Sequence, residues 1–129
     1  MTTETQVRQA ADRLFAAITE GDVEAVADLW SDDVTVWHQG DERDSDKARA
    51  LKVIRWYVGA TTHRHYEVLD RQVFDGGFVQ QHVLHCTSAR GEEVALRVCL
   101  VVKIGGDGLI RRIDEYLDPA DLAPLLSQR

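Results

Sequence analysis

The short, glycine-rich breaks in the second half of the chain constrain its fold most strongly. Four strand-like segments follow one another there, at residues 63–74, 78–88, 93–104 and 109–117. The breaks between them read DGG, ARG and GGDG. Breaks this short join antiparallel neighbours, because parallel strands need a long crossover connection. The second half is therefore predicted to form an antiparallel meander.

The first half has helical periodicity instead. Apolar residues recur every three or four positions over residues 5–20, over 23–30, and in a third stretch that Ser45 is predicted to cap. A short strand is predicted at residues 34–38, and Asp118 with Pro119 is expected to begin a last short helix. Helices followed by a meander are typical of one α+β domain, here residues 1–129.

Charge and composition exclude several classes of partner. The net charge is −7, which disfavours binding to nucleic acid or to an anionic membrane surface. No apolar run approaches the roughly 20 residues of a membrane span, and the opening MTTETQ lacks the apolar region of a signal peptide. We therefore expect a cytoplasmic protein in which Cys86 and Cys99 are free thiols.

Strand alternation indicates which side chains face a core. In residues 93–104 the even-numbered positions from Leu96 to Val102 are all apolar, so they mark the core face. On the first strand His38 shares a face with two valines. On the last strand one face carries Ile113 and Glu115, the other Ile110 and Arg112, and the pattern alone leaves this choice open.

Two stretches resemble a known superfamily. LFAAITEGDVEAVADLWSDDVTVWH is similar to the opening of ketosteroid-isomerase-like proteins, and GGDGLIRRIDEYLDP to the closing strand of SnoaL-like cyclases and limonene-epoxide-hydrolase-like proteins. The chain is accordingly identified as resembling the nuclear transport factor 2-like superfamily. The resemblance implies a cone-shaped α+β barrel, with three N-terminal helices wrapping a curved antiparallel sheet and a short C-terminal helix. It also implies a homodimer and one small apolar ligand.

Residue by residue, the resemblance counts against ketosteroid isomerase chemistry. That enzyme uses an Asp base with a Tyr and a protonated Asp as oxyanion donors. The base position falls on His38, the Tyr position on Leu14 and the second Asp position on Leu100. Leucine donates no hydrogen bond, so the dienolate mechanism of that enzyme is not expected here.

The same resemblance implies a different site. It assigns His38, Glu115 and His85 catalytic roles. It implies that the pocket is lined by Leu14, Trp56, Tyr66, Gln81, Val83, Leu100, Ile113 and Leu117. Glu115 matches a water-activating Asp of the epoxide-hydrolase-like relatives, although their accompanying Arg is replaced here by Val83.

The expected function is acid–base proton transfer, with His38 as the proton acceptor, Glu115 orienting it, and His85 or Tyr66 donating to a substrate oxygen. Such chemistry serves isomerisation, cyclisation or dehydration. Alternatives are a small-molecule-binding domain without catalysis and epoxide-hydrolase-like water activation. A strand-end role for His38, an Arg111 ion pair for Glu115 and a core role for His85 also stay open. No metal or cofactor is expected.

Overall fold

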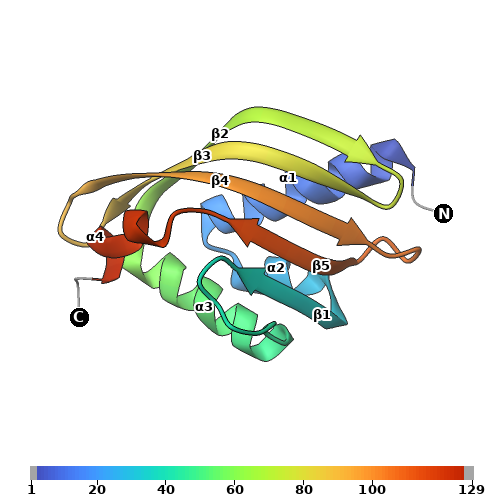
Figure 1. Ribbon diagram of the computed structural model, residues 1–129, viewed down its shortest axis with the longest axis horizontal. Coiled ribbons are helices and arrows are strands. Elements are labelled where there is room, and N and C mark those ends of the chain that lie inside the picture. Colours follow the sequence, from blue (N-terminus) through green and yellow to red (C-terminus); the bar gives the residue numbers. More distant parts are fainter. Residues whose placement is uncertain (1–2, 127–129) are drawn as a thin grey trace.

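The computed structural model describes residues 3–126, which form helices packed against one curved sheet (Figure 1). The elements in chain order are α1 (Glu4–Glu20), α2 (Val23–Leu29), β1 (Trp30–His38), α3 (Lys47–Ala60), β2 (Thr61–Phe74), β3 (Gly77–Ser88), β4 (Glu93–Ile104), β5 (Ile110–Tyr116), the 3₁₀ helix η1 (Pro119–Leu122) and α4 (Ala123–Leu126). The predicted α+β class is confirmed.

The five strands lie in the order β1-β5-β4-β3-β2. The three hairpins of the second half are antiparallel, as their short turns predict. β1 is the exception, because it pairs with β5 in parallel and makes the sheet mixed rather than wholly antiparallel. β1 is followed by α3 rather than by a hairpin, so nothing in its connection forces an antiparallel partner.

Local capping explains where the helices begin and end. Thr3 and Gln6 form a capping box at the start of α1, and Gly21 ends that helix in the left-handed conformation, with φ 74°. Asp22 caps α2, where its side chain accepts a hydrogen bond from the Ala25 backbone amide. The cap of α3 is Asp46 rather than Ser45, whose backbone instead pairs with Val36 of β1.

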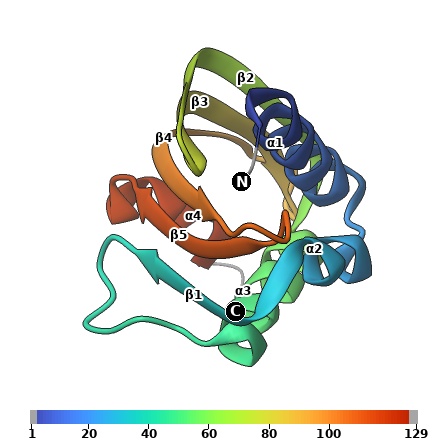
Figure 2. The ribbon, with the colours of Figure 1, turned by 90° about the vertical axis from the view of Figure 1, so that its right-hand side faces the viewer.

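The helices cover the concave face of the sheet, leaving the space between them as the core (Figure 2). α1 contributes one apolar stripe, with Val7, Ala11 and Leu14 almost fully buried. β4 turns the predicted even-numbered residues toward these helices. Within residues 3–126, no helix has the length and apolar character needed to cross a membrane.

β3 faces the core with the residues opposite to those the resemblance implied. Its even-numbered side chains, from Phe78 to Ser88, are buried, and its odd-numbered ones are not. The register explains this, because Gln80 pairs with Leu100 and Leu84 with Leu96, and cross-strand partners share a face. The implied inward orientation of Gln81, Val83 and His85 is therefore wrong.

Two irregularities in β2 also change which side chains reach the core. The pairing of β2 with β3 shifts between Thr62 and His65 and again between Val68 and Asp70. A bulge reverses the alternation beyond it. As a result Tyr66 and Arg71, which strict alternation would place on opposite faces, both lie beside inward-facing residues of β3.

Candidate functional site

A hollow lies between the concave face of the sheet and helices α1 and α3. Its inner part has a volume of about 60 Å³ and its outer part about 280 Å³. The two parts share six lining residues: Ile18, His38, Ile54, Tyr66, Leu84 and Glu115. The outer part approaches the lower end of the volume range of small-molecule sites, roughly 300–1,000 Å³.

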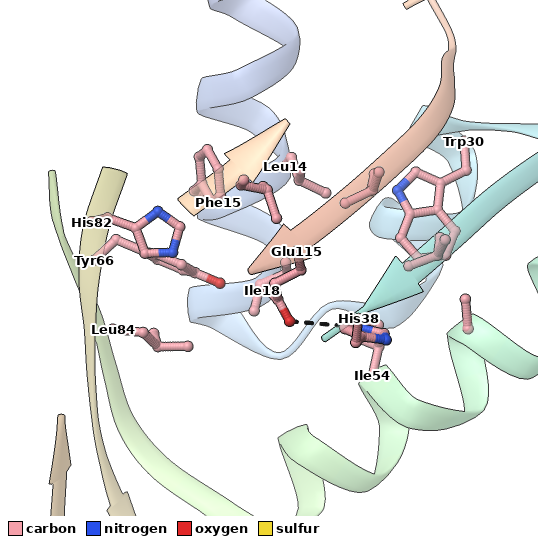
Figure 3. A pocket seen from close by; sticks show the side chains of 14 residues that line it. Leu14, Phe15, Ile18, Trp30, His38, Ile54, Tyr66, His82, Leu84 and Glu115 are labelled. Carbon is pink, nitrogen blue, oxygen red and sulfur yellow. Dashed lines mark ion pairs between the residues drawn. The ribbon is translucent and has the colours of Figure 1, made fainter. Parts of the chain in front are cut away.

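His38 and Glu115 lie next to one another on the same side of this hollow (Figure 3). They are direct register partners on the parallel strands β1 and β5, so the sheet itself sets them side by side. His38 Nε2 lies 3.6 Å from Glu115 Oε1. The structure thus brings together the imidazole and the carboxylate that the sequence places 77 positions apart.

The turn after β1 adds a second carboxylate to His38. Asp41 Oδ2 lies 3.3 Å from His38 Nδ1, on the ring nitrogen opposite to Glu115. Two hydrogen bonds hold this turn in place. The Trp37 indole donates to the backbone carbonyl of Asp41, and the backbone amide of Gln39 donates to the backbone carbonyl of Glu115. A carboxylate only accepts, so Nδ1 of His38 carries hydrogen and Nε2 is the nitrogen presented to the hollow.

Glu115 occupies an environment that favours its neutral form. Burial raises the pKa of its carboxyl, the charge of His38 opposes this, and nearby Asp41 adds to the rise. The side chain keeps 26% exposure because the hollow opens to solvent. A carboxyl group with a raised pKa is suited to hold or return a proton beside His38 Nε2.

The remaining side chains supply a largely apolar wall. Leu14, Leu100 and Ile113 line the inner part, whereas Trp56 and Leu117 line the outer part. Trp56 is 38% exposed and stands at the rim. Tyr66 borders both parts, and burial together with the charge of Glu115 raises the pKa of its phenol, which stays neutral and able to donate a hydrogen bond.

His85, Gln81 and Val83 do not belong to this site. All three lie on the outer face of β3, because the register of β3 with β4 turns the even-numbered residues inward. His85 Nε2 pairs there with Glu67 Oε1 at 2.8 Å, and its ring stacks on His65. The predicted placement of His85 in the site is therefore wrong.

Two polar residues of the site were not predicted. Asp41 lies in a segment with no periodicity, where only its spacing of three from His38 across a Gly40 turn signals a contact. His82 lies on β3 and lines the inner part of the hollow. His82 could have been found from the pairing of β3 with β4. The even-numbered residues of β3 pair with the all-apolar face of β4, so they face the core.

Cys86 is on the buried face of β3, beside the Tyr57 phenol, and burial raises the pKa of its thiol. Neither cysteine lines the inner or outer part of the hollow. Among residues 3–126, no three His, Cys, Asp or Glu side chains are grouped to hold a metal ion. The polar groups of His38, Asp41 and Glu115 are gathered at the mouth of the hollow.

Sequence comparison identifies one family. The model of the SnoaL-like domain matches residues 11–113. No curated protein has significant sequence similarity to the chain. The matched region contains β1 to β4 and the first half of β5, so it includes His38 and ends just before Glu115.

Solved structures share the fold at low sequence identity. PrhC from Penicillium brasilianum superimposes with a TM-score of 0.85 at 14% identity, covering 98% of this chain and 89% of that one. A SnoaL-like polyketide cyclase, so named provisionally, from Shewanella denitrificans gives 0.80 at 10% identity, covering 98% and 100%. An LEH-like epoxide hydrolase from M. tuberculosis gives 0.77 at 18% identity, covering 96% and 91%. At such identities these similarities establish the fold.

Proposed function

This chain belongs to the SnoaL-like domain family, and from that premise we propose that it catalyses proton transfer on a small, apolar, oxygen-bearing substrate. The observation that carries the proposal is the 3.6 Å approach of His38 Nε2 to Glu115 Oε1 inside an apolar hollow. Folds of this kind host many chemistries, so the function depends on the side chains of the site.

The proposed step begins with His38 Nε2 unprotonated and directed at the substrate. It accepts a proton from a carbon next to a carbonyl group, and the bonding electrons move to the carbonyl oxygen. Asp41 and Glu115 stabilise the imidazolium from its two sides. Return of the proton to a different carbon completes an isomerisation. Its delivery to the alkoxide formed when the enolate attacks a second carbonyl group completes a cyclisation, and its delivery to a departing hydroxyl group releases water in a dehydration. General acid–base assistance of this kind contributes roughly 10²–10⁴-fold.

The walls favour an apolar substrate. The inner part is lined mainly by hydrocarbon, from Leu14 and Ile18 of α1 to Leu100 and Ile113 of the sheet. Such a surface binds carbon skeletons because both surfaces lose contact with water. It offers few hydrogen bonds to a phosphate or a sugar. A compact ketone with one or two rings suits the combined inner and outer space.

The test is hydrogen exchange on model ketones in D₂O. We expect the protein to accelerate loss of the α-hydrogens of 2-tetralone or a related bicyclic ketone, followed by proton NMR. Replacing His38 with Gln should reduce kcat/KM roughly 10²–10⁴-fold, because the accepting nitrogen is lost.

The matched control is His85→Gln. It makes the same replacement on an imidazole that pairs with Glu67 on the outer face of the sheet. This variant should exchange at the wild-type rate. Equal losses in the two variants, or wild-type exchange by His38→Gln, would contradict the proposal.

A second candidate is ligand binding without turnover. It is favoured by the carboxyl groups beside both nitrogens of His38, which satisfy a protonated ring without any ligand. In that case the model ketone would be bound, with chemical-shift changes at Ile54 and Tyr66, while its α-hydrogens exchanged no faster than in buffer. The two candidates thus differ in the exchange rate and not in binding.

A further inference from the structure

A chain of four polar side chains enters the inner end of the hollow from the surface. Asp12 of α1 accepts from Arg71 at 2.9 Å, and Arg71 Nε donates to Gln80 Oε1 at 2.7 Å. The amide nitrogen of Gln80 lies 2.9 Å from His82 Nδ1. Gln80 and His82 are both fully or almost fully buried, so this chain lies inside the protein for most of its length.

The order of donors fixes the protonation of His82. Arg71 only donates, so the Gln80 atom that it contacts is the carbonyl oxygen. The other end of the amide is then the NH₂ group, which donates to His82 Nδ1. Nδ1 therefore holds the lone pair, and the single hydrogen of the neutral ring is on Nε2.

The surroundings keep this imidazole neutral. His82 is 2% exposed, and its burial, assisted by the positive charge of Arg71, lowers the pKa of the ring to about 4. The groups packed against it from the other elements are the rings of Phe15 on α1 and Tyr66 on β2. Glu115 and His38 line the same cavity from the opposite side. At neutral pH the ring is a donor at Nε2 and carries no charge.

The Nε2 side of the ring faces the hollow. His82 lines the inner part, and Figure 3 shows its ring beside Tyr66 on the side of the cavity opposite His38. Among residues 3–126, no hydrogen-bond acceptor is found at Nε2, although Nδ1 is engaged by Gln80. Nε2 is not among the buried polar atoms that lack a partner in residues 3–126, so it is open to the hollow, where an incoming oxygen atom can accept its hydrogen.

We propose that His82, held as the Nε2–H tautomer by Arg71 and Gln80, donates a hydrogen bond to the carbonyl oxygen of the substrate at the inner end of the hollow. The inference deepens the proposed function and rests on it for the identity of that oxygen. His82 then serves where negative charge develops as His38 removes the proton. Arg71 and Gln80 are positioning residues, since they act through the ring of His82.

The first test reads the tautomer directly. Nitrogen-15 NMR of the wild-type protein at pH 7 should show His82 protonated at Nε2 and unprotonated at Nδ1. Gln80→Glu is nearly isosteric but turns the amide into a carboxylate, which Arg71 keeps ionised and which only accepts. The proton of His82 should then move to Nδ1. The matched control is Gln81→Glu, the same change on the exposed face of β3, which should leave the His82 spectrum unchanged.

The second test measures the hydrogen bond to the ligand. Wild-type protein should bind 2-tetralone at least about 5-fold more tightly than 2-methylenetetralin, in which a CH₂ group replaces the oxygen, since one hydrogen bond of about 1 kcal/mol corresponds to that ratio. Gln80→Glu and the ring-preserving His82→Phe should each abolish this preference. Thermal unfolding of both variants checks that they remain folded.

The outcomes separate this proposal from the proposed function. Loss of ketone exchange in His38→Gln with the binding preference retained supports His82 as the donor. A wild-type His82 protonated at Nδ1, a preference that persists in both variants, or no affinity for 2-tetralone overturns the assignment. A wild-type protein that binds 2-tetralone selectively yet exchanges none of its hydrogens overturns the proposed function alone.

Discussion

Burial and the charge of His38 shift the pKa of Glu115 in opposite directions. Its carboxylate lies in an apolar hollow, where burial raises its pKa, and only the charge of His38 offsets part of that cost. In the folded protein the group binds a proton more tightly than in the unfolded chain. Between the ordinary value of 4.5 and the raised one, stability therefore falls as pH rises, and it stays lower above that window.

Replacing Glu115 with Gln should remove this pH-dependent cost. We expect the variant to be more stable than the wild type at pH 8, on the order of 1 kcal/mol, and the gap to close at pH 4, where the wild-type group is protonated in both states. Thermal unfolding at the two pH values measures the difference. Glu42→Gln, a change at an exposed position outside the hollow, should show no such gap. A Glu115→Gln variant less stable at pH 8 than at pH 4, relative to wild type, would contradict the argument.

Among the elements, the orientation of β3 determines which of its side chains line the hollow. Its two faces both carry apolar residues, Phe78 and Leu84 on one and Val79 and Val83 on the other. Alternation by itself therefore selects neither face. The choice is made by pairing with β4, whose inner face is unambiguous. The result is that His82 lies inside and His85 outside.

Truncation on the two faces of β3 should have unequal costs. Leu84→Ala removes buried hydrocarbon from the inner face and should cost about 2–3 kcal/mol, at the low end for such changes because the site already borders a cavity. Val83→Ala on the outer face should cost less than about 1 kcal/mol. Urea unfolding of both variants measures this. Equal costs, or the reverse order, would mean that β3 presents its other face.

The sequence predicted the elements better than it predicted their contacts. Helical spacing located α1 and α2, and the glycine-rich turns located the meander, because both signals are local. The parallel pairing of His38 with Glu115 and the β2 bulge that turns Arg71 inward depend on strands far apart in sequence. Strand alternation predicts which face of the sheet carries His38. Its contact with Glu115 depends on the register between β1 and β5, which the sequence pattern does not show.

At the scale of the whole molecule, the curved sheet and the helices enclose a hollow that is lined mainly by apolar side chains and by few polar groups. Those groups stand on opposite sides, with His38 and Glu115 from β1 and β5, and Tyr66 and His82 from β2 and β3 (Figure 3). A substrate between them would meet a proton acceptor on one side and hydrogen-bond donors on the other. We propose that this arrangement, rather than any single residue, is the functional unit.

A double-mutant cycle on ketone exchange tests that claim most directly. The rates of wild type, His38→Gln, Glu115→Gln and the double variant are compared with 2-tetralone in D₂O. If His38 and Glu115 act as one unit, removing either side chain already removes their joint contribution to the rate. The double variant should therefore be no slower than the slower single variant. Losses that multiply in the double variant would show two independent groups and contradict the coupled pair.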